Sequence, residues 1–504
     1  MFQESALHDL SPDDRALFEA FGSGPIRTPP FDHVHHAVET HAARRPHVTA
    51  VEHLGESLTY AELDIRASLL AELLVRRGVR PGDHVGLFLS RSISMVVGIL
   101  AVLKAGAAYV PQDARTASQD ELRRVVRHTR IDVVLTTSED AAVLPDHLAA
   151  VVTIDTLPDV RAFHRTITAD SEIAAVVLTS GTGVRISHAT LCNVLLTAPG
   201  SLRITPGTRV SQLLHIASRT AMWEILGALV NGGTLVLRGD DAERTASTAD
   251  VVIATPGVLQ SIDPDRCRRA HTVAVTGERC PRALADRWSR RAAFFNACGR
   301  TELGIVNTVQ QHEPGSGPLA IGRPVPNTTV YVLDEDRRPC PIGAIGEMWA
   351  GGACVTEGYA GLADLTARWY RPDPFLGGDH VMFRTHDLVR WTSDGRLEHH
   401  GQVGDLVEVR GFRVSPYAVT TALESAEDCD HATTLVHDGR LTSFISPATA
   451  SPDAARRAVA QRLPYYCVPG LIVPVGSLPA TDRGKLDQPA LLSRLDGERQ
   501  APVA

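Results

Sequence analysis

Apolar runs alternate with amphipathic stretches through the first 320 residues of the chain. The runs DVVLTT, AAVVLTS, GTLVLRG and DVVIATP are dominated by Val, Ile and Leu, which is typical of parallel strands covered on both faces by helices. Residues 34–79 predict two amphipathic helices around a strand and a turn, with Thr59 and Glu62 as a capping box. Residues 93–106 predict a buried helix that ends at Gly106.

The pattern changes at about residue 320, where short strands lie between Gly and Pro turns. This texture is typical of a distorted antiparallel sheet or small barrel. Gly401 and Gly404 mark the predicted hinge, residues 401–405. We therefore predict an α/β protein with a large N-terminal core over 1–400 and a small, mobile α+β domain over 406–504.

Composition restricts the possible functions further. The chain has 504 residues, 44% hydrophobic and 21% charged, which suits a soluble protein of more than one domain. A net charge of -8 argues against a nucleic-acid partner, and no apolar run is long enough to predict a membrane span. The acidic N-terminal stretch is unlike a signal peptide, so we expect a cytoplasmic location.

Metal and thiol chemistry receive little support from the sequence. The eight cysteines are scattered without a C-x-x-C pair, so we expect reduced thiols. His33, His36 and His41 do not form a clean ligand pair, and a solvated helix face is the favoured interpretation. Cys298 could be a nucleophile, but a buried, inert thiol is the stronger alternative.

One strand is followed by a glycine-rich loop that could bind an anion. Its residues precede a segment that could begin a helix, and backbone N–H groups near a helix start can bind phosphate. No lysine follows, the nearby cation is Arg185, and the spacing differs from the G-x-x-x-x-G-K-[ST] loop. A plain turn is therefore the alternative. The loop residues are Thr179, Ser180, Gly181, Thr182 and Gly183.

Three further stretches carry candidate chemistry, each with a plainer alternative. Thr301 and Glu302, in NACGRTELG, could hold phosphate and Mg²⁺, or could simply cap a helix. Asp387, in FRTHDLVR, could accept hydrogen bonds from ribose hydroxyls, or could be a solvated loop carboxylate. Lys485, in TDRGKLD, lies in a glycine-containing loop and could be merely solvated.

Taken in order along the chain, these stretches resemble a known family. The segments LTYAEL, LKAGAAYVPQD, MWEILGAL, NACGRTE, IGRPVPNTTVYVLD, FRTHDLVR, VRGFRV and LPATDRGKLD match the adenylation domains of nonribosomal peptide synthetases, in the adenylate-forming superfamily. The resemblance covers nearly the whole chain. It implies a large and a small domain with the active site between them, and enzymes that use ATP and Mg²⁺ to couple a carboxylate to AMP before passing the acyl group to a phosphopantetheine thiol or another acceptor.

The resemblance also assigns roles to individual residues. It implies that Thr301 faces the α-phosphate, that Glu302 holds Mg²⁺ and that Asn296 lies near the adenine. It further implies that Asp387 binds the ribose hydroxyls and that Lys485 bridges the carboxylate and the α-phosphate.

The chain departs from the family pattern on the nucleotide side. Its phosphate loop, residues 179–183 followed by Arg185, is five residues short and lacks the lysine. Cys298 replaces the aromatic residue that stacks on adenine, Arg300 replaces a proline and Gln402 replaces a cation. Losing a base stack removes about 1–3 kcal/mol, so we expect ATP binding to be weakened or lost unless Arg185 or Arg300 supplies a new cation.

The acyl pocket departs as well. Arg219 stands where amino-acid-activating members have the aspartate that binds the substrate ammonium. An arginine pairs with a carboxylate instead, so we expect a substrate other than a standard α-amino acid, and a second anionic group would suit it. Alternatively, Arg219 turns away or pairs with an internal acid. The other predicted pocket residues are Thr220, Trp223, Ala274, Thr276, Ala297, Ile305 and Val306.

Two hypotheses follow. In the first, the protein is a free-standing adenylation-type ligase of natural-product biosynthesis that activates a small carboxylic acid for a carrier protein acting in trans, since no carrier domain follows residue 504. In the second, the fold has lost ATP cleavage and performs an ATP-independent condensation or acyl transfer, or binds a ligand or partner as a pseudoenzyme. We favour the first because Thr301, Glu302, Asp387 and Lys485 are retained.

Overall fold

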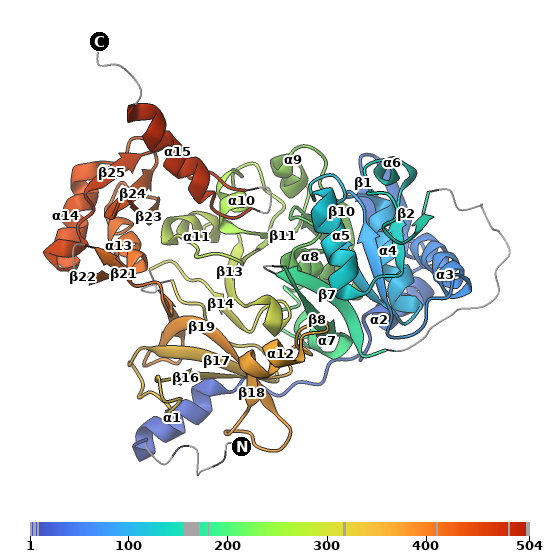
Figure 1. The fold of residues 1–504 in the computed structure, drawn as a ribbon, viewed down its shortest axis with the longest axis horizontal. Helices are drawn as coiled ribbons and strands as arrows, with labels where there is room; N and C mark the ends of the chain where they lie inside the picture. Colours follow the sequence, from blue (N-terminus) through green and yellow to red (C-terminus); the bar gives the residue numbers. More distant parts are fainter. Residues whose placement is uncertain are drawn as a thin grey trace.

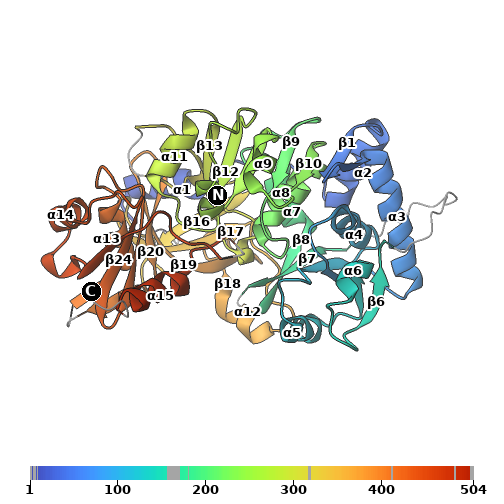
Figure 2. The ribbon, with the colours of Figure 1, turned by 90° about the horizontal axis from the view of Figure 1, so that it is seen from above.

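The computed structural model describes residues 3, 7, 10–155, 171–179, 181–315, 319–409, 412–481 and 484–499. Two large sheets and an antiparallel sheet form the large N-terminal domain, and a small α+β domain lies at one end, beside α11 and β13 (Figures 1 and 2). The mixed α/β architecture with a large and a small domain confirms the fold class predicted from the sequence.

The first sheet has six strands in the order β6-β5-β3-β4-β7-β8. All neighbours are parallel except the final pair, β7 and β8. Its strands are β3 (His84–Phe88), β4 (Ala108–Gln112), β5 (Val133–Thr136), β6 (Ala150–Thr153), β7 (Ile173–Thr179) and β8 (Thr182–Ser187). The helices connecting them are α4 (Ile93–Lys104), α5 (Gln119–Thr129) and α6 (Ser138–Ala141).

The second sheet has nine strands in the order β15-β14-β13-β12-β11-β9-β10-β1-β2, parallel in the middle and antiparallel at both edges. Its strands are β1 (Thr49–His53), β2 (Glu56–Thr59), β9 (Arg209–Gln212), β10 (Thr234–Leu237), β11 (Val251–Ala254), β12 (Thr272–Val275), β13 (Ala293–Cys298), β14 (Thr308–Gln311) and β15 (Arg323–Pro324). The helices around it are α2 (Val34–Arg44), α3 (Tyr60–Arg76), α7 (His188–Leu195), α8 (Arg219–Val230), α9 (Ala242–Ser247), α10 (Pro256–Gln260) and α11 (Arg282–Ser289).

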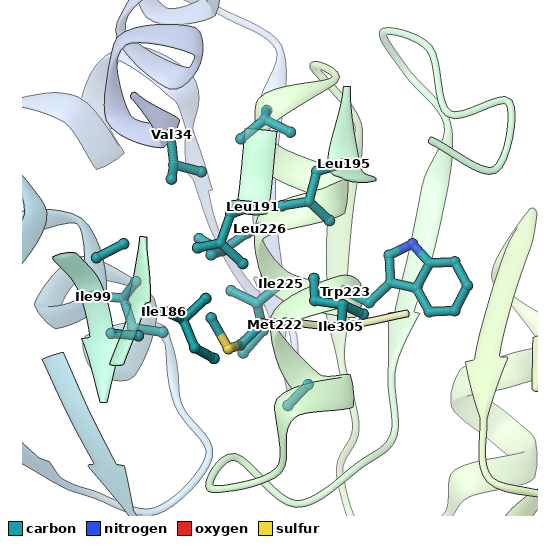
Figure 3. Packing of buried hydrophobic residues seen from close by; sticks show 14 of the residues in the cluster. Val34, Ile99, Ile186, Leu191, Leu195, Met222, Trp223, Ile225, Leu226 and Ile305 are labelled. Carbon is teal, nitrogen blue, oxygen red and sulfur yellow. The ribbon is translucent and has the colours of Figure 1, made fainter. Parts of the chain in front are cut away.

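The main hydrophobic core lies between these two sheets. Helix α4 contacts β3 and β4 of the first sheet and β1 of the second, while α8 contacts β9 and β10. Figure 3 shows how Ile99 of α4, Ile186 of β8 and Leu226 of α8 meet in this core. Burial of such side chains contributes about 1.5–3 kcal/mol each, so the strands that carry the polar site are attached to a rigid interior.

The third sheet is antiparallel and precedes the small domain. It consists of β16 (Thr328–Leu333), β17 (Gly346–Gly352), β18 (Tyr370–Pro372), β19 (Val381–Trp391) and β20 (Leu397–Gln402). Helix α1 (Pro12–Gly22) packs on β16, and α12 (Ala363–Trp369) precedes β18. This agrees with the antiparallel sheet expected after residue 320.

Over the residues that the structure describes, the small domain contains two short sheets and three α-helices. Its elements are β21 (Val407–Val409), β22 (Phe412–Val414), α13 (Pro416–Leu423), β23 (His431–His437), β24 (Arg440–Ser446), α14 (Pro452–Arg462), β25 (Leu471–Pro474) and α15 (Gln488–Arg499). Gly401, with φ of +95°, is the second-last residue of β20, and Gly404, with φ of +92°, lies between β20 and β21; both belong to the predicted hinge. Their left-handed backbone favours glycine, and rotation about them stays a prediction.

Local signals in the sequence agree well with these elements. The capping box at α3 is present, because Thr59 Oγ1 accepts from the Glu62 N–H and Glu62 Oε2 accepts from the Thr59 N–H at 2.8 Å. Helix α4 ends at Lys104 and Gly106 follows with φ +74°, as expected. The expected start of a helix directly after Gly183 is wrong, because Thr182–Ser187 form strand β8 and α7 begins only at His188.

All eight cysteines are free thiols, seven of them buried.

Across the described part of the chain, no helix has the length and apolar character needed to span a membrane. Over the same residues, no cluster of three or more His, Cys, Asp or Glu side chains is placed to hold a metal ion. His41, one of the three histidines considered in the sequence, instead has its Nε2 3.0 Å from the Val230 carbonyl oxygen.

Candidate active site

A cavity of about 850 Å³ lies where the large domain meets the small one. The strand ends of β13, β19 and β20, the helices α12 and α13, and the loop before α15 all contribute to its wall. Ligand pockets commonly have this size. The predicted site residues that line it are Thr179, Thr182, Arg219, Asn296, Ala297, Cys298, Thr301, Glu302, Asp387 and Lys485.

Thr301 and Glu302 lie in the single 3-10 turn η2 (Thr301–Leu303), directly after β13. The guanidinium of Arg219, at the start of α8, donates to the carbonyl oxygens of Gly299 and Ile305 and so links both sides of this turn. Glu302 Oε1 accepts a hydrogen bond from the Tyr359 hydroxyl at 2.8 Å. The turn therefore presents a hydroxyl and an oriented carboxylate together at the cavity wall.

Asp387 is buried on β19, and three side chains surround its carboxylate. Arg300 donates to both oxygens, from Nη2 to Oδ1 at 3.1 Å and from Nε to Oδ2 at 3.3 Å. Gln402 Nε2 donates to Oδ1 at 2.8 Å, and His399 Nε2 lies 3.6 Å from the same oxygen. Burial alone would raise the pKa of Asp387, but hydrogen bonding with His399 and the charge of Arg300 outweigh it and lower the pKa to about 2.

The Lys485 loop of the small domain is attached to the large domain. Thr255 Oγ1 donates to the Gly484 carbonyl oxygen at 2.8 Å, and the Leu486 N–H donates to Glu278 Oε1 at 2.6 Å. Burial raises the pKa of Glu278, although the Leu486 N–H and the charge of Lys485 act against that rise. Lys485 thus reaches the cavity from a loop whose flanking residues are held by the large domain.

A second set of contacts joins the two domains beside the cavity. Arg279 pairs with the buried carboxylate of Glu424 at 2.6 Å, and its guanidinium lies 5.2 Å from the centre of the Tyr417 ring. The Tyr417 hydroxyl donates to the His399 carbonyl oxygen at 2.7 Å. These contacts fix α13 against the large domain in the arrangement that carries Lys485 to the cavity.

The predicted phosphate loop is short. Strands β7 and β8 are antiparallel and remain paired as far as Thr179 opposite Thr182, so only two residues connect them. One of these, Ser180, lies outside the described residues, and the other, Gly181, has φ +83°. Thr179 and Thr182 reach the cavity, whereas Gly181 and Gly183 are not part of its lining.

Arg185 does not line the cavity either. Its guanidinium donates to the Glu357 carbonyl oxygen, and its backbone pairs with residues 357 and 358. Arg300, the other cation considered from the sequence, does line the cavity. The structure therefore places Arg300, but not Arg185, at the cavity, whereas the sequence offered both as the replacement cation.

Asn296 and Cys298 lie near the end of β13, in the cavity wall. The Asn296 amide donates to the Ala320 carbonyl oxygen at 2.9 Å, which orients the side chain. Burial raises the pKa of the Cys298 thiol to about 12, with Asp387 adding to the rise. A thiol in this state is protonated at neutral pH, which argues against the nucleophile considered in the sequence.

Most of the predicted acyl pocket is closed in this structure. Trp223 is fully buried and donates from Nε1 to the Gly200 carbonyl oxygen at 2.7 Å. Figure 3 shows Trp223 and Ile305 among the packed core side chains. Of the predicted pocket, only Arg219 and Ala297 line the cavity; the residues that do not are Thr220, Trp223, Ala274, Thr276, Ile305 and Val306.

Several cavity residues had no sequence signal strong enough to select them. Tyr359 precedes α12, Trp369 is the last residue of α12, and His399 lies on β20. All three stand in stretches that carry no compact motif. Aromatic residues that line a cavity can pack against a planar ligand. Only proximity in the folded chain brings these side chains to Thr301 and Asp387.

The residues present are compatible with ATP and Mg²⁺, which the resemblance implies. Arg219, Arg300 and Lys485 bring positive charge to the cavity, and Glu302 provides a carboxylate. Magnesium commonly takes one or two protein carboxylates and completes its coordination with phosphate oxygens and water, so a single oriented glutamate is sufficient.

Comparison with known proteins identifies the class that this fold and site represent. The sequence profile described as AMP-binding enzyme matches residues 38–360, which is more than half of the chain. The chain therefore belongs to the AMP-binding enzyme family, whose members are adenylate-forming, acid-activating enzymes.

Individual relatives agree with this assignment. Adenylate-forming reductase 06235 of Coprinopsis cinerea is 41% identical over 510 residues, covering 98% of this chain and 50% of that protein. Novobiocin biosynthesis protein H of Streptomyces niveus is 32% identical over 486 residues, covering 89% of this chain and 80% of that protein. The chain thus spans about half the length of the first of these relatives.

A solved structure agrees in fold. The four-domain nonribosomal peptide synthetase AB3403, in its holo form bound to AMP and glycine, superposes with a TM-score of 0.83 at 26% identity. The match covers 95% of this chain and 38% of the synthetase. The family resemblance drawn from the sequence motifs is confirmed by these comparisons.

Proposed function

We propose that this enzyme couples a small carboxylic acid to ATP, forming an acyl-adenylate and releasing pyrophosphate. One observation carries the proposal. Thr301, Glu302, Asn296, Asp387 and Lys485, drawn from distant parts of the chain, line the same cavity at the meeting of the two domains.

In the proposed reaction, a carboxylate oxygen attacks the α-phosphorus of ATP. A new oxygen–phosphorus bond forms, the bond to the bridging oxygen of the β-phosphate breaks, and pyrophosphate leaves with that electron pair. Both reactants are anionic, so the reaction needs cations and N–H donors around the α-phosphate. Lys485 supplies a cation between the carboxylate and the phosphate, and the Thr301 hydroxyl donates to a phosphate oxygen.

The remaining residues bind and orient the nucleotide. Asn296 contacts the adenine edge, Asp387 accepts from the ribose hydroxyls, and Thr179 and Thr182 donate to the outer phosphates. Glu302 holds Mg²⁺, which neutralises phosphate charge when bound. The Tyr359 hydroxyl supports this assignment, since its hydrogen bond to Oε1 leaves Oε2 of the same carboxylate for the metal.

Arg219 supports a substrate that lacks an α-ammonium group. Its positive charge, at the wall of the cavity that Ala297 also lines, repels a second cation. Two of its five N–H donors are bound to backbone carbonyl oxygens, and three are left for a substrate carboxylate or another acceptor. We propose that the acyl group then passes to a carrier thiol or a small acceptor.

Pyrophosphate release tests the proposal. The purified chain is incubated with Mg·ATP and a panel of aliphatic monocarboxylic acids, dicarboxylic acids, aryl acids and α-amino acids. We expect release with at least one acid that is not an α-amino acid. The Lys485→Ala variant should lose about 10²–10³-fold in rate, because a charged donor near the developing phosphate charge is removed.

Arg494→Ala is the matched control, since Arg494 is an exposed cation of α15 outside the cavity. It should retain the wild-type rate. No pyrophosphate with any acid, together with no ATP binding at millimolar concentration, contradicts the proposal. An α-amino acid as the best substrate contradicts the role given to Arg219.

The shortened β7–β8 hairpin favours a second candidate, an ATP-independent acyl transfer or ligand-binding function. With two residues between paired strands, the hairpin offers few free N–H groups to a triphosphate. This candidate predicts that the acids bind without ATP and that Mg·ATP leaves their affinity unchanged. Calorimetric titration of each acid with and without Mg·ATP separates the two functions.

A further inference from the structure

The partners of Asp387 lead to an inference about how this enzyme binds phosphate. Arg300 and Gln402 occupy both oxygens of the carboxylate with hydrogen bonds of 2.8–3.3 Å. With the side chain nearly fully buried, few directions of approach remain. Oδ1 accepts from both Arg300 and Gln402, so a ribose diol can bind both oxygens of Asp387 only if one of these donors moves away.

The position of Arg300 determines where it can move. It immediately precedes Thr301 and Glu302 in the chain and lines the same cavity. Its side chain is 32% exposed, so the guanidinium is accessible to a ligand in the cavity. Released from Asp387, the guanidinium stays within reach of phosphates held at Thr301.

The other nearby arginines are held by partners other than Asp387. Arg185 is bound to the Glu357 carbonyl oxygen and does not line the cavity. Arg279 is paired with Glu424, and Arg390 is paired with Glu398 at 2.7 Å. Arg219 holds the backbone on both sides of the η2 turn. Of these arginines, Arg300 alone is held by the carboxylate that the nucleotide itself is expected to engage.

We propose that Arg300 is the phosphate-binding cation of this enzyme and that it exchanges Asp387 for a nucleotide phosphate when ATP binds. The ribose hydroxyls take over the carboxylate, and the guanidinium pairs with a phosphate oxygen. A bidentate guanidinium suits phosphate as well as carboxylate, so the exchange keeps the buried charges paired. The exchange compensates for the lysine absent from the β7–β8 hairpin. This inference rests on the proposed use of ATP.

Titration calorimetry of the full chain with adenosine, Mg·AMP and Mg·ATP tests the exchange. Arg300→Ala should weaken ATP binding about 10- to 100-fold, the size of one charge-assisted contact, and AMP binding by a smaller factor. Adenosine affinity should stay the same or rise, because Asp387 is freed. Arg300→Lys should recover part of the ATP affinity, since the charge returns without the bidentate geometry.

Arg384→Ala is the control. Arg384 lies on the same strand as Asp387 and makes a comparable pair with Glu347 at 2.8 Å, but it does not line the cavity. Its removal should change ATP affinity less than threefold.

Three outcomes overturn the inference. If Arg300→Ala tightens ATP and adenosine alike, Arg300 only blocks Asp387. If it weakens both equally, or neither, Arg300 does not contact phosphate. A wild-type chain that binds no ATP contradicts the proposed function as well, whereas the first two outcomes leave the proposed function intact.

Discussion

At the scale of single residues, two arginines organise the cavity, and sequence alone could not have distinguished their tasks. Arg219 and Arg300 both replace residues that the family resemblance leads one to expect, and both were candidate anion-binding groups. In the fold, Arg219 holds backbone carbonyl oxygens and Arg300 holds a carboxylate. An arginine side chain is long and flexible, so its partner depends on which distant segment lies beside it.

Asp387 yields a prediction about stability and pH. Its pKa is lowered from 3.8 to about 2 in the folded chain, so its pairing stabilises the fold above the unfolded-state pKa of 3.8 and is lost as pH falls through 2. The shift corresponds to about 2 kcal/mol, roughly half of it lost by pH 3. Asp387→Asn should therefore lower the free energy of unfolding at pH 7 by about this amount, and by less at pH 3.

Urea unfolding at both pH values measures the difference. Asp336→Asn serves as the control, since that carboxylate is exposed and its one ion pair, to Arg338, spans 3.7 Å. Its effect should stay within about 0.5 kcal/mol. A pH-independent effect of Asp387→Asn would contradict the account of the buried ion pair.

At the scale of elements, helices and buried strands were predictable because their signals are local. The α3 capping box and the apolar run of α4 lie within the elements that they define. Strand β8 was not predictable in this way. Its backbone pairs with β7 on one side and with residues 357–360 on the other, including Ala360 N–H to the Gly183 carbonyl oxygen at 2.8 Å. That second partner lies far away in sequence.

The distance in sequence between contacting segments also explains which site residues could be predicted. Thr301, Glu302, Asp387 and Lys485 stand in compact motifs, and all four line the cavity. The predicted acyl pocket depended on the direction in which packed side chains point, and residues such as Trp223 lie in the core. The sequence position of such a residue determines which element carries it, but not whether its side chain points into the core or into the cavity.

The β7–β8 hairpin gives a prediction at this scale. Gly181 has φ +83° with no atom within 4 Å of an added Cβ, so backbone strain is the only penalty for a side chain there. Gly181→Ala should reduce stability by roughly 1 kcal/mol. Gly476 has equally open space and no left-handed φ, so Gly476→Ala is the matched control and should be nearly neutral. Thermal unfolding of the two variants compares them, and equal melting temperatures would contradict the strained turn.

At the scale of the whole molecule, the position of the small domain determines whether a lysine reaches the cavity. The chain has two lysines. Lys104 is 1% exposed and paired with Asp64 at 2.9 Å, whereas Lys485 is exposed on the loop held by Thr255 and Glu278. Lys485 is therefore the accessible lysine, and its reactivity depends on how the small domain lies against the large one.

Acetylation with an amine-reactive reagent measures the accessibility of the two lysines. Lys485 should react rapidly and Lys104 slowly, as peptide mass spectrometry would show. Mg·ATP and a substrate acid, each at about ten times its own dissociation constant, should slow the acetylation of Lys485 about tenfold. The N-terminal amine serves as the internal reference. An unchanged rate at Lys485 would contradict its contact with the reacting groups.

The central claim is that the cavity joins a carboxylate to the α-phosphate of ATP, and isotope transfer tests it most directly. A substrate acid labelled with ¹⁸O in its carboxylate is incubated with the enzyme, Mg·ATP and a thiol or hydroxylamine acceptor. Attack of the carboxylate on the α-phosphorus, followed by acyl transfer, leaves one labelled oxygen on AMP and none on pyrophosphate. We predict that result by mass spectrometry. Unlabelled AMP, or label in orthophosphate with ADP as the product, would contradict the claim.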